Sequence, residues 1–179
     1  TMKTKSTVLI AMMIAIIIAL GFIPGIPLGF IPVPIILQNM GIMLAGALLG
    51  PKRGFLAVLI FLLLVALGLP VLSGGHGNMA VFIGPSAGYL LAYPFAAFFI
   101  GLITEKLDNP SFLVEFICIW LIGFLFIDAM GAIGLTIQSH LPIDKSLLSN
   151  LVFIPGDTIK VLIVTFIHRR FKNNPLLQV

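Results

Sequence analysis

Asp157 and Lys160 are the residues of this sequence whose types and spacing most clearly suggest chemistry. They lie three positions apart in a long apolar segment, directly after Pro155 and Gly156. Side chains at i and i+3 share one face of a helix, so the carboxylate and the ammonium group are expected to be neighbours. The pair places an acceptor-only group beside a group with three N–H donors. This suits a ligand that carries N–H groups next to a carbonyl or carboxylate.

The cost of burying this pair argues for a function. A charge inside a membrane-spanning segment costs at least about 2.5–3.5 kcal/mol on insertion scales, and such charges usually mark functional sites. Pro155 and Gly156 can interrupt the helix, and freed backbone groups are tolerated only against protein or a cavity. We therefore predict a ligand site at Asp157 and Lys160. An internal ion pair that only fixes helix packing is the alternative.

Three other polar side chains are predicted to share this site. Gln38 follows a proline-rich run, Asn78 ends a glycine-rich run, and Tyr93 lies in an apolar segment before Pro94. All three fall in the same half of the predicted bundle. Each is able to hydrogen-bond a ligand or simply another helix.

Two further acids lie in a single apolar segment. Asp128 is deep in it and has no partner nearby in sequence. It is a candidate for pairing with Lys160, for a hydrogen bond within the bundle, or for proton transfer. Glu115 lies near the start of the segment, where we expect its side chain to extend to the membrane surface.

Catalytic and metal sites are not indicated. The single cysteine, Cys118, has no Cys or His neighbour at zinc-ligand spacing, and His76 lies in the glycine-rich run. That run lacks the Gly-Lys-Ser/Thr ending of a phosphate-binding loop, so the chain alone cannot power transport with ATP. We expect no enzymatic activity, no metal, no cofactor and no nucleic-acid partner.

The composition identifies the class of protein. Hydrophobic residues make up 60% of the 179 residues and charged residues only 9%, whereas soluble domains carry about 25% charged residues. The predicted fold class is an all-α integral membrane protein with a single transmembrane substrate-binding domain over residues 1–179.

Apolar runs predict the number of helices, because crossing a bilayer takes about 20 apolar residues. We predict a bundle of six transmembrane helices with ordered outer loops, at residues 8–23, 35–49, 55–69, 86–103, 112–137 and 147–167. The glycines in 112–137 also allow a bend. Five spans is the alternative, because 35–49 and 55–69 are short enough to form one re-entrant pair.

Basic residues predict the orientation, since an even number of spans puts both termini on one side. That side then holds Lys3, Lys5, Lys52, Arg53, Lys106, Arg169, Arg170 and Lys172, and the opposite side holds only Lys145. Cytoplasmic loops carry an excess of Lys and Arg. Both termini are therefore expected to be cytoplasmic, with the proline-rich and glycine-rich loops facing outward.

Small residues mark one face of the first span. Ala11, Ala15 and Ala19 recur every four residues among bulky Ile, Met and Leu. Small residues at this spacing let another helix approach closely. The face is a predicted contact surface, either within the bundle or with a partner.

Five segments, in order, resemble the biotin-specific substrate-binding subunit of energy-coupling-factor vitamin transporters. They are IPVPIILQN at 31–39, GALLGPKRG at 46–54, GLPV at 68–71 with GGHG at 74–77, GPSAGYL at 84–90, and PGDTIK at 155–160. The resemblance covers most of the chain. It implies a six-helix bundle in a bacterial plasma membrane, with one vitamin site near the outer face that is closed by the first and third loops.

The resemblance also implies roles for particular residues. Asp157 and Lys160 would contact biotin, and the alanine face would meet a transmembrane coupling subunit that is joined to two cytoplasmic ATPases. The family pattern has glycine where Asn78 stands and small residues near Tyr93. These two residues are therefore predicted from location and chemistry alone.

The predicted function is high-affinity capture of biotin outside the cell and its uptake, energised by a separate ATPase module. One alternative is the same scaffold with another vitamin, such as thiamine or riboflavin. The other is a proton-coupled transporter in which Asp128, Asp157 and Lys160 form the relay.

Overall fold

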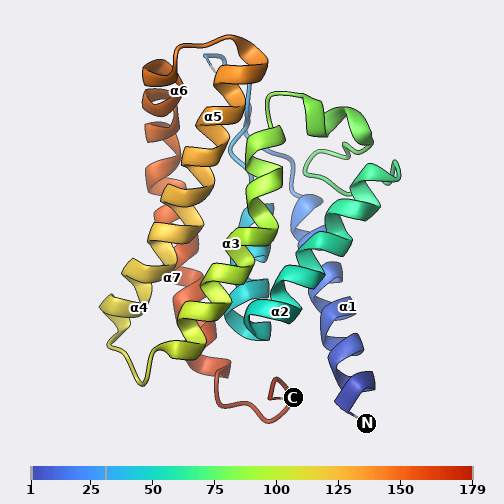
Figure 1. Cartoon of the computed structure of the whole chain (residues 1–179), viewed down its shortest axis with the longest axis vertical. Helices are drawn as coiled ribbons and strands as arrows, with labels where there is room; N and C mark the ends of the chain where they lie inside the picture. The colour runs from blue at the N-terminus through green and yellow to red at the C-terminus, as the bar shows by residue number, and fades with distance from the viewer. Residues whose placement is uncertain (1, 31, 179) are drawn as a thin grey trace.

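The structure is a computed structural model that describes residues 2–30 and 32–178. Thr1, Val179 and Ile31, the first residue of the IPVPIILQN segment, lie outside the described residues. Helices make up the regular structure of the described chain, which has two isolated β-bridges and no strand (Figure 1). The predicted all-α class is thus confirmed.

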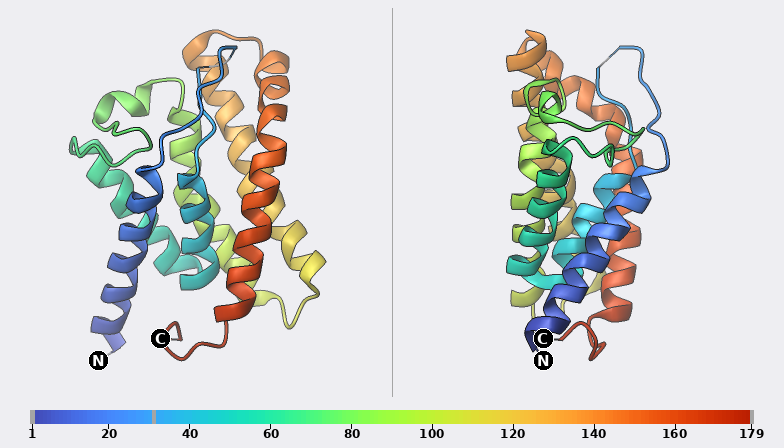
Figure 2. Two further views of the ribbon diagram at one scale, coloured as in Figure 1. Left: turned by 180° about the vertical axis from the view of Figure 1, so that it is seen from behind. Right: turned by 90° about the vertical axis from the view of Figure 1, so that its right-hand side faces the viewer.

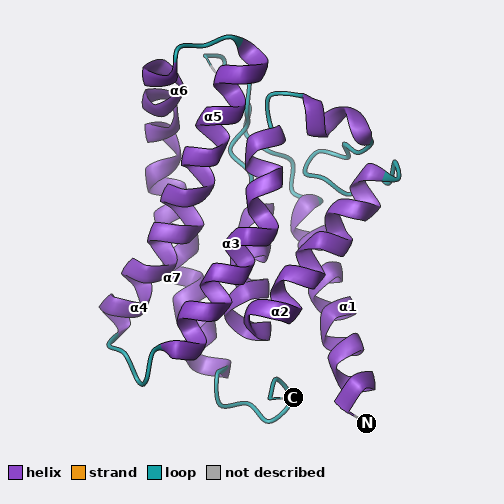
Figure 3. Ribbon diagram, in the orientation of Figure 1, coloured by secondary structure: helices purple, strands orange, loops and turns teal. Residues whose placement is uncertain are grey.

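Long and short helical segments alternate along the described chain (Figure 3). They are α1 (Met2–Gly21), α2 (Gln38–Ala66), the 3₁₀ helix η1 (Met79–Ile83), α3 (Ala87–Lys106), α4 (Phe112–Trp120), the π-helical η2 (Leu121–Phe126), α5 (Ile127–Ser139), α6 (Ile143–Ser149), the 3₁₀ helix η3 (Asn150–Phe153) and α7 (Ile154–Phe171). Five segments are long and apolar enough to cross a membrane: Lys3–Gly21, Gln38–Ala66, Ala87–Lys106, Phe112–Ser139 and Ile143–Phe171.

α2 covers the region of two predicted spans and is broken at Gly50. This residue has φ 80° and ψ 179°, a conformation that glycine adopts readily, and Pro51 follows it. After the break the chain turns back along itself. A Cβ atom at Gly54 would lie 2.7 Å from the carbonyl oxygen of Ala45. The helix end predicted at Gly50-Pro51 is present, although the number of membrane crossings depends on how the two parts of α2 are counted.

The part of α2 before Gly50 forms the centre of the bundle. Almost all of residues 38–50 are buried, and Ile42 and Met43 are fully enclosed. α2 packs against α1, α3 and α7. Small residues allow close packing elsewhere too, because a Cβ atom at Gly134 in α5 would lie 2.7 Å from the backbone nitrogen of Gly88 in α3.

The bend expected within 112–137 is the π-helical turn η2, which separates α4 from α5. It contains Gly123, where a Cβ atom would lie 2.9 Å from the sulfur of Met43. Single π-helical turns inside α-helices are frequent at functional sites. Here the turn ends two residues before Asp128.

Both termini lie at one end of the bundle, and two long loops lie at the other (Figure 2). The first loop, 22–37, is closed by the bridge between Ile26 and Ile35, and the second, 67–78, by the bridge between Leu72 and His76. The loops also contact each other, since the Ser73 hydroxyl donates to the carbonyl of Ile23 at 3.0 Å. The two loops together form a cap over this end of the bundle.

Candidate ligand-binding site

A cavity of about 610 Å³ lies under the two loops, with walls from α2, α3, α5 and α7. Its lining is mostly apolar. The five predicted ligand-binding residues all line it, namely Gln38, Asn78, Tyr93, Asp157 and Lys160. The structure therefore brings together side chains that are separated by up to 122 positions in the sequence.

Asp157 and Lys160 form the predicted pair on α7. Lys160 Nζ lies 2.8 Å from Asp157 Oδ1, and the two residues are only 6% and 4% exposed. Pro155 occupies the first turn of α7 after the 3₁₀ helix η3, so the change of helix type places the pair at the start of a new helix. A carboxylate is favoured there because it lies near the positive end of the helix dipole.

The ammonium group of Lys160 is fully engaged. Besides Asp157 it donates to Asn39 Oδ1 at 2.9 Å and to the backbone carbonyl of Ile36 at 2.5 Å, and an ammonium group has three donors. Asn39 Nδ2 donates to Asp157 Oδ1 at 3.3 Å, which leaves Asp157 Oδ2 without a recorded donor among the described residues. Asn39 was not among the predicted site residues, although it directly follows Gln38.

The Gln38 side chain stabilises the position of the second loop, 67–78. Its side-chain Nε2 donates to the carbonyls of Ile17 and Val71, and its Oε1 accepts from the backbone nitrogen of Ser73 at 3.0 Å. Both amide hydrogens are thus used by the protein, so only Oε1 has capacity left for a ligand. Gln38 ties α1, α2 and the second loop together at the cavity wall.

Asn78 has an unusual backbone at the edge of the cavity. Its φ of 142° and ψ of 177° lie in a region that glycine occupies almost exclusively. The side-chain Oδ1 caps η1 by accepting from the backbone nitrogen of Ala80 at 2.8 Å. The side-chain NH₂ group has no hydrogen-bond partner among the described residues, and Asn78 is an exposed residue of the cavity lining.

Tyr93, Tyr89 and Asp128 complete the polar lining. Tyr93 is buried in α3, and Tyr89 lies one turn before it. The Tyr89 hydroxyl donates to Asn150, and Asn150 Nδ2 donates to the backbone carbonyl of Asp128 at 2.8 Å. Tyr89 and Asn150 were not predicted, because each is an isolated polar residue whose partner is distant in sequence.

The whole chain matches one family of known proteins. The sequence pattern of the BioY family matches residues 1–175. The chain belongs to the BioY family. It is 53% identical over 173 residues to a biotin transporter BioY of Lactococcus lactis subsp. cremoris, a match that covers 95% of this chain and 92% of that protein. It is 45% identical over 174 residues to a biotin transporter BioY of Rhizobium etli, with 94% and 93% covered.

A solved structure has the same fold. The crystal structure of the S-component for biotin from an ECF-type ABC transporter superposes with a TM-score of 0.93 at 52% identity, and the match covers 97% of this chain and 93% of that one. The resemblance noted from sequence motifs is therefore confirmed. The chain is a multi-pass membrane protein of a transporter family, which is not an enzyme class.

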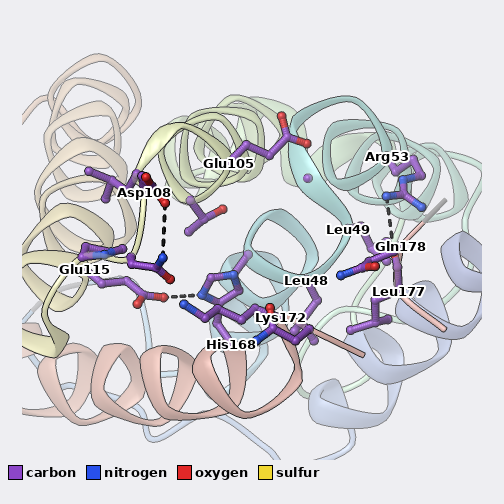
Figure 4. Close-up of a pocket in the computed structure, with 17 residues that line it drawn as sticks. Leu48, Leu49, Arg53, Glu105, Asp108, Glu115, His168, Lys172, Leu177 and Gln178 are labelled. Atoms are coloured by element: carbon purple, nitrogen blue, oxygen red, sulfur yellow. Dashed lines mark hydrogen bonds and ion pairs between the residues drawn. The ribbon is translucent and has the colours of Figure 1, made fainter. Parts of the chain in front are cut away.

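A second cavity, of about 560 Å³, lies at the end of this BioY-family chain that carries the termini. Figure 4 shows its lining, which includes Arg53, Glu105, Asp108 and Lys172. None of the predicted ligand-binding residues lies here. Leu177 and Gln178 of the C-terminal tail line this cavity. Lys5 Nζ holds the tail in place by donating to the carbonyls of Pro175 and Gln178 at 2.6 and 3.0 Å.

Glu115 lies in the wall of this second cavity, and the expectation that it extends to the membrane surface is wrong. The residue is 2% exposed. His168 is hydrogen-bonded to its Oε1, and Arg169 Nη1 donates to its Oε2 at 3.0 Å. Both partners come from α7, more than fifty positions away, and their hydrogen bonds offset the cost of burying this carboxylate.

The alanine face of α1 lies on the outside of the bundle. Ala11, Ala15 and Ala19 are exposed, whereas Met13 and Ile17 point into the core. This arrangement excludes packing of the alanine face against another described helix of the same chain. Among the described residues, no group of three or more His, Cys, Asp or Glu side chains is arranged to hold a metal ion.

Proposed function

We propose that this chain captures biotin outside a bacterial cell and delivers it across the plasma membrane, as the substrate-binding subunit of an energy-coupling-factor transporter without catalytic activity of its own. The observation that carries the proposal is the buried Asp157–Lys160 pair at a cavity of about 610 Å³. Ligand pockets are commonly about 300–1,000 Å³ with a few placed polar groups. The similarity to a biotin transporter BioY and to the S-component for biotin from an ECF-type ABC transporter also supports the proposal.

The chemistry of biotin suits this lining. Its ureido group has two N–H donors and a carbonyl, its thioether ring and aliphatic tail are apolar, and its tail ends in a carboxylate. Asp157 Oδ2 accepts from a ureido N–H, and the NH₂ group of Asn78 donates to a ligand oxygen. Lys160 donates to the carbonyl or the carboxylate after giving up one of its present acceptors, and Tyr93 and Gln38 complete the polar contacts.

We further propose that the two parts of α2 cross the membrane separately, which gives six spans and cytoplasmic termini. The break at Gly50 and the return of the chain past Ala45 support this topology. The common position of the termini and the excess of Lys and Arg at that end support the orientation. The capped cavity then opens toward the outside, where biotin is captured.

The partner in this proposal is a transmembrane coupling subunit joined to two cytoplasmic ATPases, and it docks on the alanine face of α1. The exposure of Ala11, Ala15 and Ala19 supports this surface. An Ala15→Trp variant is expected to lose co-purification with the coupling subunit and to keep its affinity for biotin. An Ile16→Trp variant, at an exposed position in the same turn but outside the alanine repeat, is the control. Intact co-purification of Ala15→Trp would reject the surface.

Calorimetric titration of the purified, detergent-solubilised chain tests the main proposal. Biotin should bind in the nanomolar range with one site per chain, and thiamine and riboflavin should not bind. If the folded protein does not bind biotin but binds another vitamin, the proposed substrate is wrong, and the role of a vitamin-binding subunit stands. If no vitamin binds, and uptake by the isolated chain collapses with an uncoupler, proton-coupled transport replaces the proposal.

A further inference from the structure

Asp128 is a buried carboxyl group that the protein leaves unpaired. The residue is 7% exposed and lines the cavity, and its Oδ2 is fully buried without a hydrogen-bond partner. No recorded hydrogen bond from a described residue reaches either of its carboxyl oxygens. The other two buried acids differ, because Asp157 is held by Lys160 and Asn39, and Glu115 by His168 and Arg169.

The surrounding structure holds Asp128 by its backbone alone. Asn150 donates to its carbonyl oxygen, and Tyr89 in turn holds Asn150. This short chain of hydrogen bonds fixes the turn of α5 against α3 and η3 and does not involve the carboxyl group. The scaffold therefore positions the side chain at the cavity and leaves its hydrogen-bonding capacity unused.

Lys160 is not the missing partner in this arrangement. Its three donors are used by Asp157, Asn39 and Ile36. A buried polar group without a partner costs about 1–3 kcal/mol, which an apolar residue at the same position would avoid. The free capacity at Asp128 thus matches a donor that comes from outside the protein.

We propose that Asp128 is a ligand-binding residue whose carboxyl group accepts a hydrogen bond from an N–H group of the bound molecule. The inference rests on the proposed function and deepens it. The two ureido N–H groups of biotin are then shared between Asp128 and Asp157, two carboxyl groups that line the cavity. A ligand without the second N–H leaves Asp128 unpaired, so this residue contributes to specificity as well as affinity.

The test compares Asp128→Leu, which removes the acceptor at similar size, with Asp128→Asn, which keeps a carbonyl acceptor. Biotin and biotin methyl ester are titrated into each purified variant, and thermal unfolding is measured without ligand. Asp144→Leu, at an exposed acid in α6, is the control. Asp128→Leu should weaken biotin binding about tenfold or more, and Asp128→Asn should weaken it less.

Two further readouts separate ligand binding from a structural role. The loss in Asp128→Leu should be equal for biotin and its methyl ester, because the carboxylate tail is not the proposed partner. The unfolding temperature without ligand should stay the same or rise, because no hydrogen bond is lost and an unpaired buried group is removed.

Unchanged biotin affinity in Asp128→Leu would overturn the inference. A loss confined to the free acid would overturn it too, and so would a fall in unfolding temperature that accompanies the loss of affinity in both variants. Failure of the wild-type chain to bind biotin would instead reject the proposed function, and the inference with it.

Discussion

The two ends of the molecule hold cavities of similar size that are built in opposite ways. The cavity under the loops, about 610 Å³, is mostly apolar and has unused hydrogen-bonding capacity at the buried residues Asp128 and Asp157. The cavity near the termini, about 560 Å³, is lined by charges of both signs, and its buried acid, Glu115, is fully partnered.

This comparison shows that the volume of a cavity does not by itself identify a ligand site. An empty ligand site keeps hydrogen-bond donors and acceptors free where little water reaches them, whereas a structural cluster pairs them with other groups of the protein. Arg53 Nη1 is also buried without a partner, but it belongs to a partly buried side chain whose Nη2 reaches the carbonyl of Leu177. The comparison predicts that the two ends respond to mutation in different ways.

The largest effect is expected at the end near the termini. Glu115→Ala removes the acceptor of His168 and Arg169 and leaves two polar groups with no carboxylate. Removal of one partner of a buried ion pair costs about 3–5 kcal/mol, and the share of Arg169 is smaller because its side chain is 34% exposed. Thermal unfolding should shift to lower temperature, with unchanged biotin affinity of the folded fraction. Glu105→Ala, at an exposed acid of the same cavity, is the control.

Asp157→Asn should give the opposite result. We expect biotin affinity to fall about tenfold or more, which corresponds to about 1.4 kcal/mol or more. The unfolding temperature should fall less than in Glu115→Ala, because the amide oxygen that replaces the carboxylate still accepts from Lys160, which also keeps its bonds to Asn39 and Ile36. Calorimetry and thermal unfolding measure the two quantities, with Asp108→Asn at the other cavity as the control. Unchanged affinity would remove Asp157 from the site.

Gln38→Ala tests the role of the loops, because it should affect ligand binding without removing the Asp157–Lys160 pair. The variant leaves the carbonyls of Ile17 and Val71 and the nitrogen of Ser73 without their shared partner. The second loop should then open more often, and biotin should dissociate faster by roughly fivefold, the equivalent of about 1 kcal/mol. Stopped-flow displacement of bound biotin measures the rate. An equal dissociation rate would show that Gln38 does not control the cap.

The smallest effect is expected for Lys5→Gln. The variant weakens the contact between α1 and the carbonyls of Pro175 and Gln178. The tail should become more accessible to carboxypeptidase, while biotin affinity changes by less than about twofold because the two sites are distant. Lys3→Gln is the matched control. A larger change in affinity would mean that the two ends are coupled.

Local spacing in the sequence was enough to predict part of the site. The pairing of Asp157 with Lys160 follows from three-residue spacing on one helix, and the break in α2 follows from Gly50-Pro51. Runs of apolar residues likewise predicted the helical segments, because each depends only on its own composition.

Contacts between distant residues could not be predicted in the same way. Glu115 meets His168 53 positions away, and Asn39 meets Lys160 121 positions away. Gln38 was assigned to the ligand from its location, and its bonds to the loop depend on how α1 and residues 71–73 come together. Contact of biotin with any of the five predicted residues, Asp157, Lys160, Asn78, Tyr93 and Gln38, stays a prediction.

The short central part of α2 has a consequence for the surrounding lipid. At 1.5 Å per residue, residues 38–49 rise about 18 Å, well below the hydrocarbon thickness of about 30 Å. A lipid-facing helix of this length would create hydrophobic mismatch and would thin the bilayer around it. Protein surrounds this helix on nearly every side, so it is insulated from membrane thickness. Gln38 and Asn39 at its start therefore hold the site at a depth that a thicker or thinner membrane does not change.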